Sequence, residues 1–252
     1  MKIVMLVGKS QSAKYFYNSL CKKYDISKVI IEDKVPAKQL IKRRIKKLGF
    51  LKVLNQILFQ LIIPKILFFN SKKRIQSIKK KYNLIDSDIP VSLIHKVKSV
   101  NDESCVKLLK KIAPNLVIVN GTRIISSKVL DTVDSYFINT HVGITPQYRG
   151  VHGAYWALAN NDKENCGVTV HLVDKGIDTG NILSQGLIEP TKKDNFVTYP
   201  LHQYGEGIKL LENVILQLEN GKIEVQKKSN ASSKLYYHPT FSLYLKNLFL
   251  KE

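Results

Sequence analysis

The sequence has 252 residues, enough for one substantial α/β core or for one domain with a small appendage. Hydrophobic residues make up 44% of it, as in soluble globular proteins, and 40 Lys and Arg against 20 Asp and Glu give a formal net charge of +20. This charge suits an anionic substrate, a nucleic acid or an anionic membrane surface, and it fits compositional bias with a solvated basic face equally well. Charge alone therefore selects no partner.

The cysteines and the apolar runs exclude several classes of protein. Cys21, Cys105 and Cys166 are isolated and lack C-x-x-C spacing, which favours a reduced cytoplasmic protein over a disulfide scaffold or a zinc site. No signal-peptide pattern follows Met1. The longest uncharged apolar stretch, residues 53–64, is too short to span a bilayer. We therefore expect a cytoplasmic protein without a resident metal.

The chain begins with a strand–turn–helix–strand unit. Apolar runs predict strands at 2–7 and 26–31, and residues 13–23 between them form a predicted helix. The connecting turn, 8–13, can present backbone N–H groups to an anion at the N-terminus of the helix. It is neither a P-loop, because Ile3 occupies the position of the leading glycine, nor a G-x-G-x-x-G fingerprint.

The segment from 36 to 89 is basic and apolar at helical spacing. Leucine and isoleucine recur from Leu40 to Ile62, and lysine and arginine crowd the opposite face at one end. The pattern predicts a basic amphipathic helix bent at Gly49 and, past Pro64, a second helix rich in lysine. The segment could adhere to an anionic membrane. We favour packing on the edge of the sheet with solvated lysines, because an apolar stripe in a globular chain usually faces the core.

The rest of the chain alternates strand and helix patterns. Strands are predicted at 89–97, 116–120, 136–138, 167–173 and 181–189, and helices at 102–112, 152–160 and 199–218. Pro200 falls in the first turn of the last helix, where proline is tolerated. Residues 225–237 and the last apolar turns form a short tail.

Polar residues with complementary chemistry follow the strand predicted at 136–138. Asn139 and His141 lie at its end, and Asp178 lies in a glycine-rich loop after the strand at 167–173. Two adjacent strands that end side by side would bring the three residues into one cleft. Taken alone, an N-x-H triplet is more often a loop cap beside a core histidine.

Three separated blocks, N-T-H at 139–141, P-x-Y-R-G at 146–150 and G-V-T-V-H-x-V-D-x-G-I-D-T-G at 167–180, together resemble the signature of the folate-dependent formyltransferases. The resemblance implies a Rossmann-like fold with a mostly parallel twisted sheet and transfer of a formyl group from 10-formyltetrahydrofolate to an amine. It assigns catalytic roles to Asn139, His141 and Asp178. Asn139 and His141 would donate hydrogen bonds to the carbonyl oxygen as it gains negative charge, and Asp178 would accept a proton and orient the imidazole.

The same resemblance suggests residues that hold the folate and the acceptor. Candidates for the folate site are Asn120, Gly121, Thr122, Ile124, Val173 and Asp174. Candidates for the acceptor site are Gly8, Ser10, Tyr148 and Arg149. Ordinary roles remain open for them: a tight strand–helix connection at Gly8 and Ser10, and bracing of the Asn139 loop by Tyr148 and Arg149. His152 could cap a helix, and His171 is interpreted as structural.

The run Y-R-G-x-H-G-A-Y-W-A-L from Tyr148 is most similar to the branch that formylates nucleotide-linked amino sugars of surface polysaccharides such as the O-antigen of lipopolysaccharide. Alternatives are glycinamide ribonucleotide or methionyl-tRNA as acceptor, or a membrane- or nucleic-acid-binding protein on the same scaffold. The 74 residues after Asp178 are too few for the last helix and the oligonucleotide-binding domain of methionyl-tRNA formyltransferases, so no nucleic acid is expected.

The expected organisation is a catalytic domain at 1–220, carrying the basic helical insertion at about 36–89, and a C-terminal extension at 221–252. Weak contact with an anionic membrane and assembly of a homodimer are left open.

Overall fold

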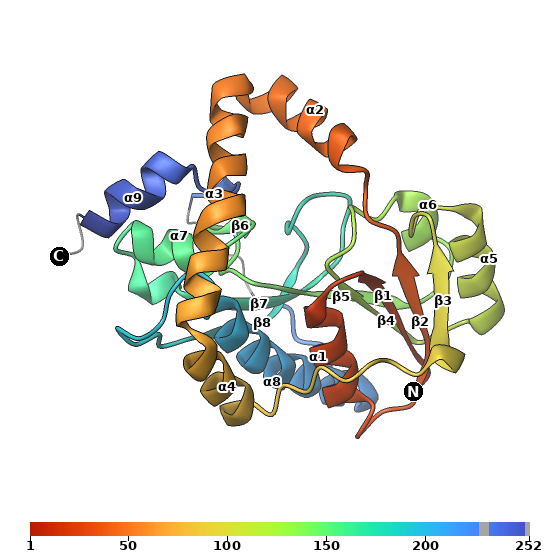
Figure 1. Ribbon diagram of the computed structural model, residues 1–252. Coiled ribbons are helices and arrows are strands. Elements are labelled where there is room, and N and C mark those ends of the chain that lie inside the picture. Colours follow the sequence, from red (N-terminus) through yellow and green to blue (C-terminus); the bar gives the residue numbers. More distant parts are fainter. Residues whose placement is uncertain (227–231, 250–252) are drawn as a thin grey trace.

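A computed structural model describes residues 1–226 and 232–249. Its centre is a seven-stranded sheet in the order β3-β2-β1-β4-β5-β7-β8, flanked by helices (Figure 1). The first five strands in that order are parallel, and β7 and β8 are antiparallel to their neighbours. The strands are β1 (Ile3–Gly8), β2 (Ile26–Glu32), β3 (Ile94–Val97), β4 (Leu116–Asn120), β5 (Tyr136–His141), β7 (Gly167–Leu172) and β8 (Ile182–Leu187). The predicted fold class, a mostly parallel α/β sheet, is confirmed.

Strand β1 is buried on both faces, as expected for the centre of a parallel sheet. Alternate side chains enter two separate cores. One core lies under α1 (Gln11–Leu20) and α8 (Tyr199–Glu219), and the other lies under α5 (Glu103–Ile112) and α6 (Ser127–Leu130). Helices thus cover both faces, and the carboxyl ends of the parallel strands form the edge at which a site is expected.

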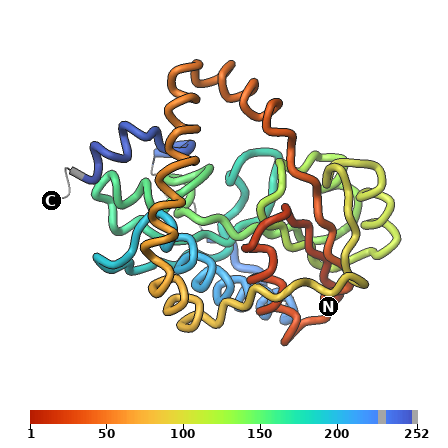
Figure 2. The backbone as a smooth tube through the Cα atoms, viewed as in Figure 1, coloured from red at the N-terminus to blue at the C-terminus, as the bar shows by residue number. Residues whose placement is uncertain are grey.

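Three helices connect β2 to β3: α2 (Ala37–Leu48), α3 (Phe50–Asn70) and α4 (Lys72–Lys81). Helices α2 and α3 stand out from the body of the domain in Figure 2, whereas α4 packs beside α8. The predicted bend at Gly49 is confirmed, because this residue has a φ of 85° between α2 and α3. The predicted break at Pro64 is wrong. Helix α3 continues through Pro64 to Asn70, and the next helix begins after Ser71.

Length and exposure of this segment also differ from expectation. Helix α3 has 21 residues and is long and apolar enough to cross a membrane, although the uncharged stretch within it was predicted to be too short. The apolar face was expected to be covered by the domain. Helix α2 has no buried residue, and 22% of the apolar window of α3 is buried. The prediction placed one stripe on the helix, whereas α3 is apolar on two faces.

Outside the segment from α2 to α4, the observed elements differ from the predicted ones in smaller ways. The strand predicted at 89–97 is extended only from Ile94, after the short 3-10 helix η1 (Val91–Leu93). Helix α7 (Gly153–Ala159) precedes a second 3-10 turn, η2 (Lys163–Asn165). The predicted tail joins the body: β9 (Leu235–Tyr236) pairs in parallel with β6 (Arg149–Gly150), and α9 (Phe241–Phe249) packs beside α3. Part of that tail, 227–231, lies outside the described residues.

Candidate active site

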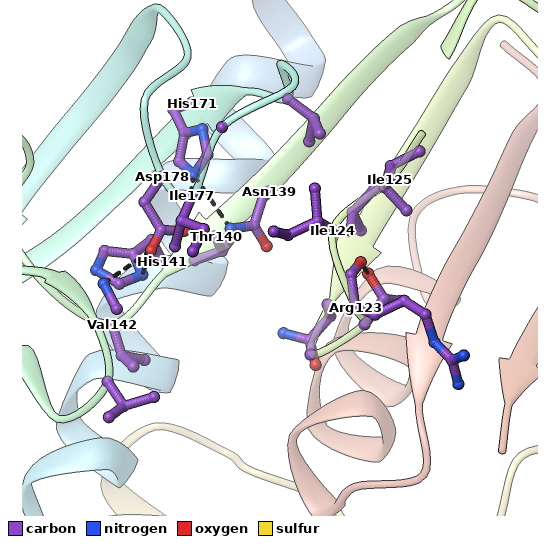
Figure 3. Close-up of a pocket in the computed structure, with 18 of the residues that line it drawn as sticks. Arg123, Ile124, Ile125, Asn139, Thr140, His141, Val142, His171, Ile177 and Asp178 are labelled. Atoms are coloured by element: carbon purple, nitrogen blue, oxygen red, sulfur yellow. Dashed lines mark hydrogen bonds and ion pairs between the residues drawn. The ribbon is translucent and has the colours of Figure 1, made fainter. Parts of the chain in front are cut away.

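A cavity of about 420 Å³ opens at the carboxyl edge of β4 and β5. Segments 119–125 form one wall, and segments 139–142, 150–151, 171 and 173–178 form the other. Figure 3 shows Asn139, His141, His171 and Asp178 grouped on one side, across from Ile124 and Arg123. The three predicted catalytic residues therefore share one cavity.

Asn139, His141 and Asp178 are brought together by a different strand arrangement from the one predicted. Asn139, Thr140 and His141 belong to β5 itself, and β7 runs antiparallel to it, with His171 opposite Asn139. The two strands do not end side by side. Instead, the loop after β7 folds back along β5 and carries Asp178 to the ring of His141.

His171 orients the amide of Asn139. The Nδ1 atom of His171 lies 2.7 Å from the carbonyl oxygen of Leu172, which can only accept, so Nδ1 carries the hydrogen. The Nε2 atom is then an acceptor, and Asn139 Nδ2 donates to it at 3.1 Å. An amide nitrogen has two hydrogens. The second N–H of Asn139 remains to be used on the cavity side.

His141 is buried between two acceptors. Its Nε2 lies 2.8 Å from the carbonyl oxygen of Tyr148 and therefore carries a hydrogen, while Nδ1 lies 3.2 Å from Asp178 Oδ2. Burial lowers the pKa of the imidazole, although the Asp178 carboxylate and the Tyr148 carbonyl oppose this effect. The neutral ring leaves Nδ1 without a hydrogen beside the carboxylate. A proton can thus be taken up between His141 and Asp178.

Asp178 is held in an uncommon backbone conformation. Its φ is 51°, in the left-handed region that non-glycine residues rarely adopt. The N–H of Gly150 donates to Asp178 Oδ2 at 2.9 Å. Burial raises the pKa of the carboxyl, but His171, His141 and the Gly150 N–H together outweigh it, so the pKa lies below its ordinary value. The carboxylate is therefore ionised at neutral pH.

Two glycines permit this packing. A Cβ on Gly143 would lie 2.7 Å from His141 Nε2 and 2.3 Å from the carbonyl oxygen of Tyr148, so any side chain would displace the bond between them. A Cβ on Gly180 would meet the carbonyl oxygen of Leu172, the same oxygen that accepts from His171. Both histidines thus depend on a neighbouring glycine for their position.

The opposite wall is fixed by a buried carboxylate at the end of β2. Glu32 accepts from the backbone N–H of Arg123 at 2.6 Å and lies 2.7 Å from its Nε, so the loop after β4 is bonded through both backbone and side chain. Asn120, at the end of β4, accepts from Ser12 at 2.8 Å. The loop is therefore fixed where it faces Asn139.

The structure separates the predicted binding residues into two groups. Six predicted for the folate line the cavity: Asn120, Gly121, Thr122, Ile124, Val173 and Asp174. The four predicted for the acceptor are not among its lining residues. Gly8 is buried against the carbonyl oxygen of Gly121, and Ser10 caps α1 by accepting from the N–H of Ala13.

Tyr148 and Arg149 brace the site from outside the cavity. The Tyr148 hydroxyl donates to Asp162 at 2.8 Å while its carbonyl oxygen holds His141. Arg149 donates to the carbonyl oxygen of Ile177 at 3.2 Å and so holds the loop that carries Asp178. Their contacts agree with the alternative in which they support the loop.

Several residues that line the cavity were not predicted for the site, among them His171 and Ser12. His171 was interpreted as structural, yet it lines the cavity and bonds to Asn139. The alternation of β7 puts Thr169 and His171 on one face of the strand, and this polar face was a signal that could have found it. Ser12 lines the cavity in place of the predicted Ser10, two residues further along the same segment. His152 begins α7 as expected, but its side chain makes no capping bond.

Comparisons with known proteins agree with this geometry. The family model described as "Formyl transferase" matches residues 58–203. A methionyl-tRNA formyltransferase from Finegoldia magna is 37% identical over 99 residues, which are 39% of this chain and 31% of that protein. The chain thus spans about a third of the length of that relative.

Solved structures of low sequence identity share the fold. A sugar N-formyltransferase from Shewanella superposes with a TM-score of 0.58 at 17% identity, covering 94% of this chain and 76% of that chain. A sugar 3N-formyl transferase, solved in the presence of dTDP and 5-N-formyl-THF, has a TM-score of 0.55 at 18% identity, covering 94% and 69%. Because the family model covers more than half of the sequence, this chain belongs to the formyl transferase family.

Proposed function

We propose that this protein transfers a formyl group from 10-formyltetrahydrofolate to the primary amine of a nucleotide-linked amino sugar. The observation that carries the proposal is the grouping of Asn139, His141, His171 and Asp178 in one cavity, with complementary hydrogen-bond directions. Family membership supports the formyl transfer. The structural neighbour that was solved with 5-N-formyl-THF supports a folate as the donor.

The cavity suits a flat, partly polar ring system. Residues 121–124, 174, 176 and 177 line it, and Ile124 and Ile177, at opposite walls, are 52% and 37% exposed. Apolar side chains of this kind can cover the faces of a ring while backbone N–H and C=O groups bond to its edge. When bound there, the folate would supply the activated formyl group.

Asn139 would stabilise charge in the transition state. As the acceptor amine forms its bond to the formyl carbon, the carbonyl oxygen gains negative charge, and the second N–H of Asn139 is available to bond to it. Loss of one such donor typically costs about 3 kcal/mol of transition-state stabilisation. His141 was also predicted to be a donor, but both of its nitrogens face protein acceptors, so we assign it to proton transfer.

His141 and Asp178 would accept the proton that the amine loses. The proton would lie between Nδ1 and Oδ2, and the resulting imidazolium would have an acceptor at each nitrogen. The bond from the formyl carbon to the folate nitrogen then breaks, and that nitrogen takes up a proton. Positioned acid–base groups of this kind contribute about 10² to 10⁴ in rate.

The nature of the acceptor is the least constrained part of the proposal. Structural neighbours include sugar N-formyltransferases and phosphoribosylglycinamide formyltransferases, and the dTDP present with one of the sugar enzymes supports a nucleotide-linked sugar. The second candidate is methionyl-tRNA, which is favoured by the sequence relative from Finegoldia magna. The surface-polysaccharide role, including the O-antigen, rests on the sequence resemblance alone.

A direct assay decides between these acceptors. Release of tetrahydrofolate from 10-formyltetrahydrofolate would be followed with a panel of nucleotide-linked amino sugars, with glycinamide ribonucleotide and with methionyl-tRNA. We expect turnover with at least one nucleotide-linked amino sugar and none with methionyl-tRNA. Turnover with methionyl-tRNA or glycinamide ribonucleotide alone would keep the family reaction and reject the sugar.

We further propose that residues 1–220 are the catalytic domain and that 221–252 are an extension rather than a second domain. Pairing of β9 with β6 supports an extension that packs on the catalytic domain, because Gly150 of β6 also donates to Asp178.

A further inference from the structure

The positive charge of this protein is concentrated in one segment. Residues 34–85 contain fifteen lysines and arginines and no aspartate or glutamate, so they hold fifteen of the net +20 charges. Among the described residues, only Arg74 and Lys79 of these fifteen make an ion pair, with Asp194 and Asp86. The others, which lie on α2, α3 and α4 except for Lys34 just before α2, form an uncompensated basic surface.

Helix α3 is apolar on two opposite faces. One face packs on the domain through Val53, Gln56, Phe59 and Ile63. The opposite face is a stripe of large side chains that are 37% to 78% exposed, which we call the exposed stripe: Leu51, Leu54, Leu58, Leu61, Ile62, Ile66 and Phe69. A helix that is apolar all round is normally buried in a core or in a membrane. Large contiguous apolar patches on a protein surface mark interaction sites.

The packed face is attached both to the catalytic domain and to the C-terminal extension. The ring of Phe59 lies 4.9 Å from that of Phe196 and 5.2 Å from that of Tyr244. Gln56 donates to the carbonyl oxygen of His238 at 2.7 Å and accepts from Arg44 at 2.6 Å. To cross a bilayer, α3 would have to leave all of these contacts.

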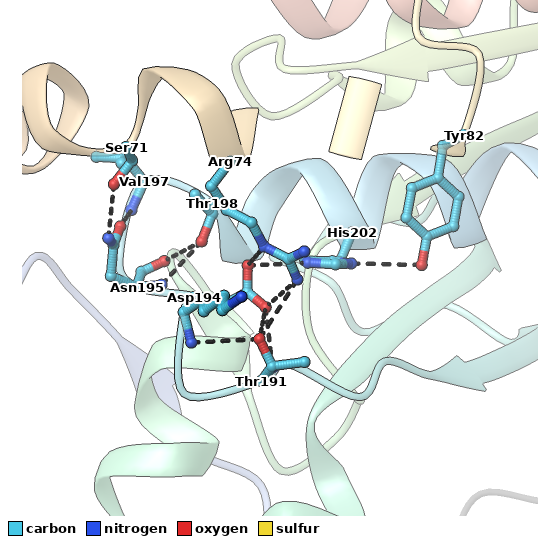
Figure 4. Close-up of polar contacts among 10 residues, drawn as sticks. Ser71, Arg74, Tyr82, Thr191, Asp194, Asn195, Val197, Thr198 and His202 are labelled. Atoms are coloured by element: carbon cyan, nitrogen blue, oxygen red, sulfur yellow. Dashed lines mark hydrogen bonds and ion pairs between the residues drawn. The ribbon is translucent and has the colours of Figure 1, made fainter. Parts of the chain in front are cut away.

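Helix α4 fixes the far end of α3. Arg74 donates through two nitrogens to the buried carboxylate of Asp194, at 2.9 and 2.6 Å, and His202 reaches the same carboxylate at 3.1 Å (Figure 4). Asn195 donates to Ser71 at the junction of α3 and α4. The side of α3 that carries the exposed stripe therefore remains open to a partner.

We infer that α2 and α3 bind the surface of an anionic membrane, with the exposed stripe in the interface and the α2 cations at the lipid phosphates. The proposal is independent of the acceptor of formyl transfer. Amphipathic helices with lysine and arginine beside a large apolar face lie in the interface in this way. Lys65 falls within the stripe, and its long side chain can extend to the headgroups.

Two other occupants fit less well. A second copy of this chain would place two uncompensated basic segments against each other, and like charges oppose such an interface. A nucleic acid would use the cations but would leave the exposed stripe in water, because its backbone presents phosphates rather than apolar surface. A lipid surface satisfies both the charge and the apolar side chains.

Sedimentation with vesicles tests the inference. The full-length protein would be mixed with phosphatidylcholine vesicles with or without phosphatidylglycerol. We expect binding at least about tenfold tighter when the anionic lipid is present, because each cation near such a surface contributes favourably. Leu54→Gln/Leu58→Gln/Leu61→Gln should lower binding at least about tenfold through the loss of inserted apolar area.

Matched variants control for general effects. Val91→Gln/Leu187→Gln/Leu216→Gln removes three side chains of similar or greater exposure elsewhere and should bind vesicles like the parent. Lys38→Gln/Lys42→Gln/Arg43→Gln/Lys46→Gln should abolish the preference for anionic lipid, whereas Lys96→Gln/Lys107→Gln/Lys110→Gln/Lys111→Gln should retain it. Unchanged formyl transfer or circular dichroism in each variant would show that it folds.

Three results would overturn the inference. Vesicle binding that is absent, or that the stripe variant and its control lose equally, would exclude insertion of α3. Binding that resists both high salt and alkaline carbonate would indicate a membrane-spanning helix instead. Dimers in lipid-free solution that only the stripe variant dissociates, without vesicle binding, would assign the exposed stripe to a second copy.

Discussion

The two histidines of the site differ in what their neighbours leave free. His171 has Nδ1 on a backbone carbonyl and Nε2 on Asn139, and the same Nε2 lies 3.7 Å from Asp178 Oδ1, so we propose that it orients the amide beside the carboxylate. His141 has a carbonyl at Nε2 and a carboxylate at Nδ1, and the second contact lacks a hydrogen when the ring is neutral. From this difference in neighbours we propose that His171 orients Asn139 and that His141 accepts the proton.

Asp178→Asn and His141→Ala should each preserve the fold and lower kcat by about 10² or more, since each removes the proton acceptor. Both variants should still bind the folate. The measurement is steady-state turnover of purified protein, with a thermal melt to verify folding. Asp162→Asn is a suitable comparison, because Asp162 bonds to Tyr148 outside the cavity. Near-normal turnover in either site variant would remove that residue from the mechanism.

The acid side of the pH–rate profile should report the His141–Asp178 pair. Burial lowers the pKa of His141 from its ordinary value of 6.5, so the ring stays neutral and able to accept a proton at neutral pH. kcat should therefore be independent of pH at neutrality and fall only at pH values below 6.5, as the pair becomes protonated before the reaction. A profile that begins to fall above that value would contradict a depressed pKa.

The sequence pattern picked out three residues that share one cavity, but it did not predict their contacts. Asn139, His141 and Asp178 were identified from the spacing of three blocks, and that spacing does not state the direction of the strands. Because β7 is antiparallel to β5, His171 comes opposite Asn139, a pairing that depends on the register of the sheet. The bracing role of Tyr148 depends on its backbone carbonyl, which carries no sequence signal.

At the scale of elements, periodicity located most helices and strands, and the boundaries of β4 were predicted without error. It failed at α3 because a count of apolar positions finds a face but does not say what covers it. Pro64 was taken to end the helix, yet proline removes a single N–H donor, and flanking turns can carry the helix past it. Among the cations of α2, Arg44 bonds to Gln56 and Gln60 of α3.

The clamp between α4 and the loop before α8 should be the strongest polar contribution to the position of α3 and α4. Burial raises the pKa of Asp194, but Arg74, the Thr191 N–H and His202 lower it further, so the pKa lies well below its ordinary value. Asp194→Ala should destabilise the protein by about 3 kcal/mol at neutral pH, because it leaves Arg74 and His202 without their acceptor.

The lowered pKa of Asp194 determines how the stabilisation by this clamp depends on pH. A carboxyl whose pKa is depressed by folding contributes stability above its unfolded pKa, and this contribution is lost as the pH falls through the folded pKa. The difference in the free energy of unfolding between the parent and Asp194→Ala should therefore become smaller at acidic pH. Denaturant titrations at several pH values measure this difference. Asp88→Ala, which breaks an exposed ion pair with Lys14, should cost less than about 1 kcal/mol, and an equal loss in both variants would refute the clamp.

At the scale of the whole molecule, the net charge divides into two parts with different expected functions. The segment 34–85 holds fifteen of the +20 charges, and the other 200 residues hold the remaining five. A basic segment that includes the projecting helices α2 and α3 suits a membrane surface, whereas a nucleotide diphosphate needs a few cations beside the cavity. Added salt should therefore weaken two separate equilibria, the binding of vesicles and the binding of the acceptor.

The affinity for a nucleotide-linked acceptor should weaken as salt is added, because Lys or Arg must hold the diphosphate and such contacts are screened over about 8 Å at physiological ionic strength. The expected result is a rising KM with a nearly constant kcat, measured over a series of salt concentrations. The variant that lacks the cations at 38, 42, 43 and 46 should retain this slope while losing its vesicle binding, since those cations lie on α2 and not among the cavity-lining residues. If the slope disappears in that variant, α2 contacts the acceptor itself, and formylation of methionyl-tRNA in preference to the sugar would identify that acceptor as RNA.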